Sequence, residues 1–275
     1  MSSMPDAPVP HATLANGVRV VVLPMPQART AGVAVFVHTG SVHESRVHNG
    51  ISHVLEHMAF KGTRERDVHR VNLDAERLGA EVNAHTDKDH TAYTMRGLAE
   101  HAPQFVRMLA DIVRHATFPE DELAREREVL LQEVAEVEDD PVTIGYHLFD
   151  HLCWGEHPAA LPVIGQRRVI ERVSRADLLD YVGRQYTGAN IVVAAAGALD
   201  ADAIASAIGQ DPELGPLGAG FQTDGPLLKT DACGATSADT VVDDADTIDV
   251  EAADDRPAGR ARREARTGDA GLCEQ

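Results

Sequence analysis

The sequence predicts an α+β domain in which a mixed or antiparallel sheet is flanked by helices. Three observations support this fold class. Strand-like and helix-like periods alternate up to about residue 200. The strand pairs and helix pairs intermix without the regular strand–helix–strand order of a parallel sheet. A hydrophobic content of 43% in a chain of 275 residues is ample for a buried core.

Five segments have the sequence pattern of strands. The first two are β-branched runs bounded by glycine and proline, and the last is a continuous apolar run typical of a buried strand. The third and fourth are short and are joined by the polar turn Asp87-Lys88-Asp89. The five predicted strands cover residues 18–23, 31–38, 81–86, 91–96 and 191–196.

Seven segments have the periodicity of helices. Gly79 ends the second of them, and Pro119 suits the first turn of the long fourth helix. The predicted helices cover residues 49–59, 68–78, 102–115, 120–138, 142–152, 175–186 and 201–208.

Composition divides the chain into three parts. We expect an N-terminal extension at residues 1–16, a folded domain at residues 17–209 and a low-complexity acidic tail at residues 210–275. The tail is rich in Asp, Ala, Gly and Thr and has few large apolar residues. Such a composition buries too little surface to offset the loss of chain entropy, so we expect the tail to be mostly disordered.

The charge and the cysteine content of the chain argue against several classes of protein. The net charge of −19 argues against binding of nucleic acid or anionic membranes, because both require clustered Lys and Arg. Cys153, Cys233 and Cys273 are odd in number and far apart, which favours a reducing compartment over a disulfide framework. The sequence shows no secretory signal and no apolar run of about 18 residues. We therefore expect a cytoplasmic protein without a membrane segment.

The most informative motif is His53-Val54-Leu55-Glu56-His57, inside a predicted helix. Two histidines four residues apart stand on one helical face, so both imidazoles can reach a single ion. Glu56 lies close to that face, where its carboxylate can approach a water molecule at the ion. This H-x-x-E-H order is the inverzincin motif of zinc peptidases. It predicts His53 and His57 as metal ligands and Glu56 as the catalytic base.

A catalytic zinc site needs a third protein ligand. Glu126 and Glu133 are the best candidates, because seven residues make nearly two helical turns and both carboxylates therefore point the same way. Their backbones lie about 10 Å apart along the helix, so one should be the ligand and the other a support for the site. Helical geometry alone leaves open which is which.

Other candidate residues have a simpler interpretation. His85 and His90 are expected to be polar residues of an edge strand, since three ligands are already supplied. His147 and His151 lack an acidic third ligand, which favours a structural role over a second metal site. Tyr93 fits either substrate orientation or core packing.

Three segments resemble the insulinase, or pitrilysin, family of metallopeptidases, also called M16. They are GISHVLEHMAFKGT at residues 50–63, LGAEVNAHTDKDHTAY at residues 78–93 and ELAREREVLLQEVAEVEDDP at residues 122–141. The family includes mitochondrial processing peptidase and its bacterial relatives. The resemblance extends from about residue 17 to about residue 200, the N-terminal zinc-binding domain only.

The resemblance assigns roles to individual residues. It implies that Glu133 is the third ligand of one Zn²⁺ ion per chain and that Glu126 is a supporting residue near the metal. It also implies that Asn83, together with Ala84 and His85 on the same edge strand, binds the backbone of a peptide substrate.

The implied activity is that of a zinc metalloendopeptidase acting on peptides or unfolded segments. Glu56 would take a proton from an activated water molecule and pass it to the leaving amine. Family members pair this domain with a second one of similar fold, and nothing after residue 200 resembles it. The alternative is therefore a truncated or non-catalytic M16 subunit that binds zinc but needs a companion domain or partner for activity.

Overall fold

The computed structural model of the chain describes residues 11–210, which lie within one compact unit. The first ten residues of the predicted extension and the predicted tail from residue 211 onward lie outside the described residues. The strands are β1 (His11–Thr13), β2 (Arg19–Pro24), β3 (Thr30–Val37), β4 (Glu81–Thr86), β5 (Thr91–Leu98) and β6 (Ile191–Gly197). The α-helices are α1 (Ile51–Ala59), α2 (Val68–Arg77), α3 (Ala102–His115), α4 (Glu120–Asp139), α5 (Pro141–Trp154), α6 (Arg167–Ile170), α7 (Arg175–Gln185) and α8 (Ala201–Gln210). Short 3-10 helices lie at Ser41–His43, Ala99–His101, Pro158–Ala160 and Gly188–Asn190.

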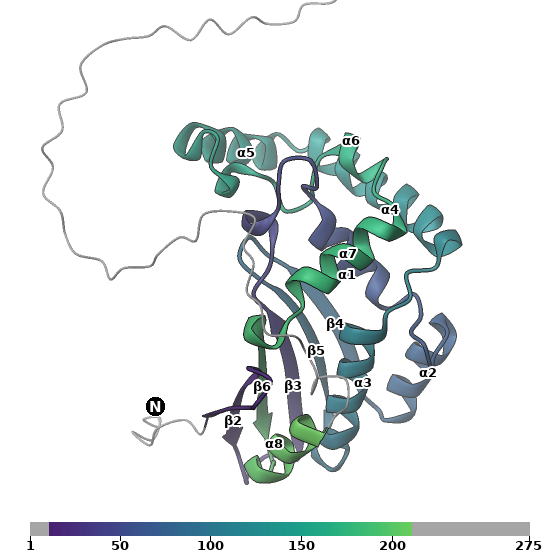
Figure 1. The fold of residues 1–275 in the computed structure, drawn as a ribbon, viewed down its shortest axis with the longest axis vertical. Coiled ribbons are helices and arrows are strands. Elements are labelled where there is room, and N and C mark those ends of the chain that lie inside the picture. The colour runs from purple at the N-terminus through teal and green to yellow at the C-terminus, as the bar shows by residue number, and fades with distance from the viewer. Residues whose placement is uncertain (1–10, 211–275) are drawn as a thin grey trace, which may run out of the picture. The chain divides into compact units, whose positions relative to one another are not determined.

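The six strands form one sheet in the order β1-β2-β6-β3-β5-β4 (Figure 1). β2 and β6 run parallel, and the other neighbouring strands are antiparallel. The predicted fold class, an α+β domain with a mixed or antiparallel sheet, is confirmed, and the parallel pair of β2 and β6 makes the sheet a mixed one. β1 was not predicted, because three residues are too few to show a period. It lies within the predicted N-terminal extension and adds an edge strand to the sheet.

Helices cover one face of the sheet. α3 packs across β3 and β5, and α8 packs on β2 and α3 (Figure 1). Alternation along β3 shows the difference between the two faces. Val33, Val35 and Val37 point into the helical layer and are at most 1% exposed, whereas Ala34 and Phe36 between them are only half-buried. The core of the domain therefore lies between the sheet and its helices.

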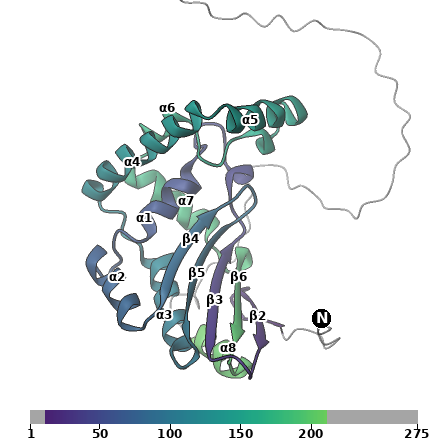
Figure 2. The same ribbon diagram turned by 180° about the vertical axis from the view of Figure 1, so that it is seen from behind.

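The opposite face of the sheet is apolar, and no described helix packs on it. Figure 2 shows this face with the strands in front of the helices. Small and apolar side chains line a shallow depression of about 580 Å³ here, among them those of Val21, Leu23, Ala34, Phe36, Ala194 and Ala196. An exposed apolar surface of this kind is typical of a face that another protein element covers.

Every predicted strand and helix is present, with ends that differ from the prediction by at most two residues. The start of α1 is one of the larger differences. The helix was predicted from residue 49, but Gly50 has a φ of 101° and helical geometry begins at Ile51. The four-residue helix α6 was missed, because it is too short to carry a period.

Among the described residues, no helix combines the length and apolar character needed to span a membrane.

Two glycines hold the start of α1 against the segment that leads into α6. Gly50 and Gly165 both have positive φ, at 101° and 85°. A Cβ atom added to Gly50 would lie 2.7 Å from the Cα atom of Gly165, and one added to Gly165 would lie 2.4 Å from the Cα atom of Gly50. Only glycine fits this backbone contact, which fixes where α1 begins.

We predict that Gly50→Ala lowers the free energy of unfolding by about 2 kcal/mol or more, because the left-handed conformation and the contact with Gly165 both oppose a side chain. Gly145→Ala in α5 is the matched control, since nothing lies within 4 Å of the added Cβ. The control should raise stability by about 0.5 to 1 kcal/mol. Urea denaturation followed by circular dichroism measures both. Equal stability of Gly50→Ala and the native chain would contradict the prediction.

Candidate metal centre

A buried carboxylate fixes the beginning of α1. Glu44 accepts hydrogen bonds from the backbone N–H groups of Gly50 at 2.7 Å and Ser52 at 2.8 Å, and from Nδ2 of Asn49 at 3.0 Å. Burial raises the pKa of Glu44, and these N–H donors act in the opposite direction. A carboxylate at this end of a helix also complements the helix dipole. Glu44 therefore sets the position of the first turn of α1, which carries His53.

The packing of α1 decides which of its side chains face the site. Six of its nine residues are buried, namely Ile51, Ser52, Val54, Leu55, Met58 and Ala59. His53, Glu56 and His57 occupy the remaining three positions and are half-buried. Helical spacing therefore turns the three polar residues of the motif toward the same side of α1.

α4 brings the two candidate glutamates to this side. Leu123, Leu130 and Val134 are buried, and α4 packs against α1. The Arg127 side chain donates to the carbonyl of Ile170 at 3.1 Å and to that of Val173 at 2.8 Å, which ties α4 to the segment around α6. The long helix is thus held in a fixed rotation about its axis.

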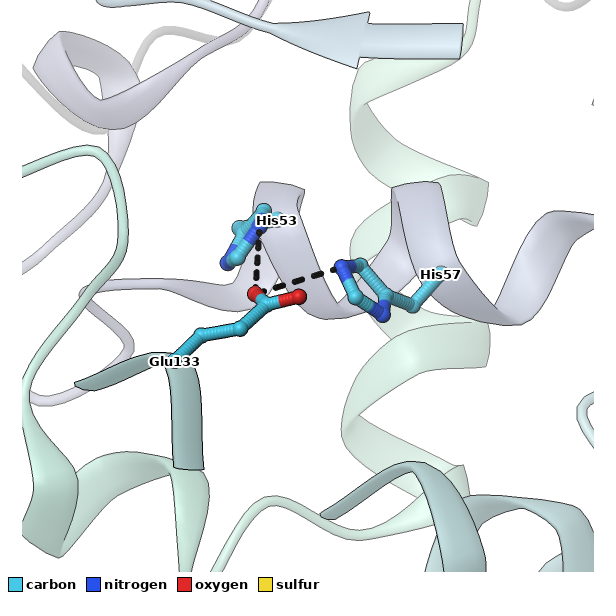
Figure 3. Close-up of side chains that lie close together, drawn as sticks. All are labelled: His53, His57 and Glu133. Carbon is cyan, nitrogen blue, oxygen red and sulfur yellow. Dashed lines mark ion pairs between the residues drawn. The ribbon is translucent and has the colours of Figure 1, made fainter. Parts of the chain in front are cut away.

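His53, His57 and Glu133 converge in space (Figure 3). Oε2 of Glu133 lies 3.6 Å from Nε2 of His53 and 3.6 Å from Nε2 of His57. The three atoms that could bind a metal all lie within 4.8 Å of one another, and no other group of three or more such residues occurs within residues 11–210. Two imidazoles and one carboxylate are a donor set of catalytic zinc sites.

Glu126 contacts the other side of the His57 ring. Its Oε2 atom lies 3.1 Å from Nδ1 of His57, and its Oε1 atom lies 2.5 Å from Nζ of Lys61. When His57 donates from Nδ1 to this carboxylate, the lone pair of Nε2 faces Glu133. A carboxylate in this position orients a metal-binding histidine and makes it more basic. The geometry therefore fits Glu133 as the ligand and Glu126 as the support.

His53 is suited to metal binding at neutral pH. Burial and, to a smaller extent, neighbouring His57 lower its pKa to about 4, although the Glu133 carboxylate acts in the opposite direction. The ring is therefore uncharged near pH 7. Its lone pair is available to an ion without the loss of a proton.

Glu56 is placed to act as a base. Its half-buried carboxylate takes part in no hydrogen bond or ion pair with the residues that the structure describes. It lies on the motif side of α1, between the two histidines in sequence. A carboxylate that is not already paired can accept a proton from a molecule bound next to it.

The predicted substrate strand, β4, is at the edge of the sheet next to α1. Among the strands of residues 11–210 it pairs only with β5, so none of them occupies its other edge. Asn83 and His85 are exposed, and Ala84 between them is buried. Tyr93 is 1% exposed, and its hydroxyl lies 2.9 Å from that of Tyr186, so it belongs to the core rather than to a substrate surface.

The histidine pair on α5 has no third ligand. His147 and His151 belong to no group of metal-binding residues within the described part of the chain.

Sequence reasoning missed Glu44 and Tyr181, which position α1. The Tyr181 hydroxyl lies 3.2 Å from Oγ of Ser52 and 2.7 Å from Oγ1 of Thr39. No local pattern links Tyr181 to α1, because the contact joins segments far apart in the sequence.

Residues 19–166 match the family model of insulinase, peptidase family M16. The chain is 37% identical over 185 residues to the uncharacterized zinc protease YmxG of Bacillus subtilis, a match that covers 67% of this chain and 45% of that protein. It is 36% identical over 173 residues to the beta subunit of the mitochondrial-processing peptidase of Homo sapiens, covering 63% of this chain and 35% of that protein. The chain thus spans less than half the length of these relatives.

Two solved structures have the same fold. A protease from Helicobacter pylori has a TM-score of 0.72 at 24% identity, over 79% of this chain and 52% of that one. A peptidase M16 inactive domain from Pseudomonas fluorescens has a TM-score of 0.70 at 23% identity, over 78% of this chain and 53% of that one.

We predict that Glu126→Gln weakens zinc binding by about 10- to 100-fold, because the amide lacks the charge that orients His57 and makes it basic. Competition with a chromophoric chelator measures the affinity. Glu128→Gln is the control, since Glu128 is exposed on the same helix and should leave the affinity unchanged. Equal affinities of the two variants would show that the contact between Glu126 and His57 does not support a metal.

Proposed function

Because the chain belongs to the insulinase family of peptidases, family M16, we propose that it is the zinc-dependent metalloendopeptidase domain of that family. The proposed reaction is hydrolysis of peptide bonds in peptides or unfolded segments. The observation that carries the proposal is the convergence of His53, His57 and Glu133, with Glu56 on the same side of α1 as the two histidines. The name of the zinc protease from Bacillus subtilis agrees with this proposal.

In the proposed mechanism, His53, His57 and Glu133 hold one Zn²⁺ ion, and Glu126 keeps His57 in the required tautomer. Zinc, when bound, lowers the pKa of water and polarises a carbonyl group. Glu56 accepts the proton from the attacking water molecule and delivers it to the leaving nitrogen of the peptide.

The free edge of β4 is the proposed binding site for the peptide. An extended peptide can add a strand to such an edge through main-chain hydrogen bonds. Asn83, Ala84 and His85 lie along this edge, and α1 packs against the same strand. Because main-chain hydrogen bonds recognise the backbone of the peptide more than its side chains, we expect loose selectivity for the peptide sequence.

We further propose that a companion M16 domain or subunit covers the apolar surfaces of this chain. One such surface is the face of the sheet on which no helix of residues 11–210 packs. The other is α5, which has no buried residue and exposes 68% of Tyr146, 61% of Phe149 and 83% of Leu152. Surfaces of this kind mark sites of protein interaction. The similar human protein is a subunit by name, and the chain spans less than half of it.

A non-catalytic M16 subunit remains the second candidate function. The observation in its favour is the short match to the relatives, together with the same fold in a domain from Pseudomonas fluorescens described as inactive. The two candidates differ in whether the isolated chain cleaves peptides, since both include zinc binding.

We predict that Glu56→Gln retains one zinc ion per chain but lowers the cleavage of a quenched fluorescent peptide by about 100-fold or more, because the base is lost while the ligands stay. Metal content and fluorescence measure the two effects. Glu76→Gln, at an exposed position on α2, is the control and should retain full activity.

The same experiment separates the alternatives. Stoichiometric zinc without cleavage by the native chain would favour the subunit that needs a companion. Native-level cleavage by Glu56→Gln would rule out Glu56 as the base, and a native chain without zinc would overturn the proposed metal centre.

A further inference from the structure

Two histidines outside the candidate metal centre face each other on the uncovered side of the sheet. His85 belongs to β4, and His90 directly precedes β5. Their Nε2 atoms lie 3.3 Å apart, with the two ring planes at 90°. The His90 ring also packs on Phe36, at 5.7 Å between ring centroids. Phe36 lines the apolar depression on the uncovered face, so the pair lies on that side of the sheet.

The side chains of β4 alternate between the two faces of the sheet, and this places the histidine pair on the face opposite the site on α1. The Thr86 hydroxyl donates to the carbonyl of Ser52 in α1 at 3.4 Å, and Ala84 is buried. Since side chains alternate along a strand, His85 between them points to the opposite face. The pair shares no residue with the group formed by His53, His57 and Glu133.

A carboxylate orients one member of the pair. Oδ1 of Asp89 lies 2.7 Å from Nδ1 of His90. A carboxylate oxygen accepts, so His90 donates its Nδ1 proton to Asp89 in this contact. The lone pair of His90 is then on Nε2, the atom that faces His85. Glu126 and His57 form the same arrangement at the candidate metal centre.

The spacing of the two Nε2 atoms is that of two ligands of one ion. Nitrogen ligands lie about 2.05 Å from zinc, so two of them at a tetrahedral angle are about 3.3 Å apart. We propose that His85 and His90 form a second metal site, which binds a divalent transition-metal ion with a preference for imidazole, such as Zn²⁺ or Cu²⁺. Water supplies the remaining ligands, because His85 is exposed.

The turn between β4 and β5 holds the pair in place before any ion binds. Asp87 donates its N–H to the carbonyl of His90 at 2.8 Å, and Val42 donates its N–H to the carbonyl of Lys88 at 2.8 Å. The Lys88 ammonium group donates to Asp150 at 2.8 Å and to the carbonyl of Ala159 at 2.7 Å. A preformed pair of ligands loses little conformational entropy when an ion binds, which favours binding.

Two consequences follow from the number and position of the ligands. With two protein ligands instead of three, the second site binds more weakly and fills after the first. Because the ion links β4 to the residue that follows the turn, its binding stabilises the folded chain and raises the melting temperature.

The test is a titration of the metal-free full chain with Zn²⁺ by isothermal titration calorimetry. The native chain should bind two ions, and the double variant His85→Ala/His90→Ala should bind one. The double variant His147→Ala/His151→Ala, which removes the histidine pair of α5, should still bind two. Asp89→Asn should weaken the second site by about 10- to 100-fold and leave the first unchanged.

The same number of ions bound by the native chain and by His85→Ala/His90→Ala would overturn the proposal, whatever the state of the first site. A second measurement does not depend on the first site. In the variant His53→Ala/His57→Ala, bound Cu²⁺ should show electron paramagnetic resonance couplings to two imidazole nitrogens, and these should vanish when His85 and His90 are also replaced. Couplings that persist would place the ion elsewhere. Failure at either site leaves the result at the other intact, so the two proposals are tested separately.

Discussion

The reach of the Glu133 carboxylate to two imidazoles on another helix is the constraint on which the candidate centre depends. Its Oε2 atom is 3.6 Å from each Nε2 atom, and a small rotation of α4 would remove it from both. The rotation is set by Leu123, Leu130 and Val134, which are buried in the core. The position of α1 is set independently, by Glu44 and by the contact between Gly50 and Gly165. The packing of the core therefore determines the geometry of the candidate metal centre.

The two faces of the sheet differ, and this difference leaves surfaces of the domain exposed. One face is filled by helices and carries the core, whereas the other is apolar and has no described helix on it (Figure 2). β4 stands at the edge beside α1 and leaves one side of its backbone free. In the proposed function, the edge of β4 binds an extended peptide and the apolar face binds a companion domain. An unpaired strand edge and an exposed apolar face are both surfaces that other protein segments commonly cover.

Histidines oriented by carboxylates occur on both sides of the sheet. Glu126 contacts Nδ1 of His57, and Asp89 contacts Nδ1 of His90. In each case the carboxylate fixes the tautomer and directs the Nε2 lone pair toward a second nitrogen or oxygen atom. The two pairs differ in the third ligand. Glu133 completes the group on α1 and α4, while His85 and His90 have no protein carboxylate between them within the described residues.

The sequence by itself determined the α+β class, the order of the strands and helices along the chain, and the placing of His53, Glu56 and His57 on one side of a helix. These features follow from periods of two and 3.6 residues, which are local and can be read along the chain. Only the tertiary structure decided that Glu133 reaches both imidazoles while Glu126 contacts Nδ1 of His57. The two glutamates share one helical face, so the outcome depends on where along α4 the helix α1 crosses it. The same holds for His85 and His90, which sequence analysis interpreted as separate polar residues. Their contact arises where a turn folds β4 against β5, and no local period encodes a distance across a turn.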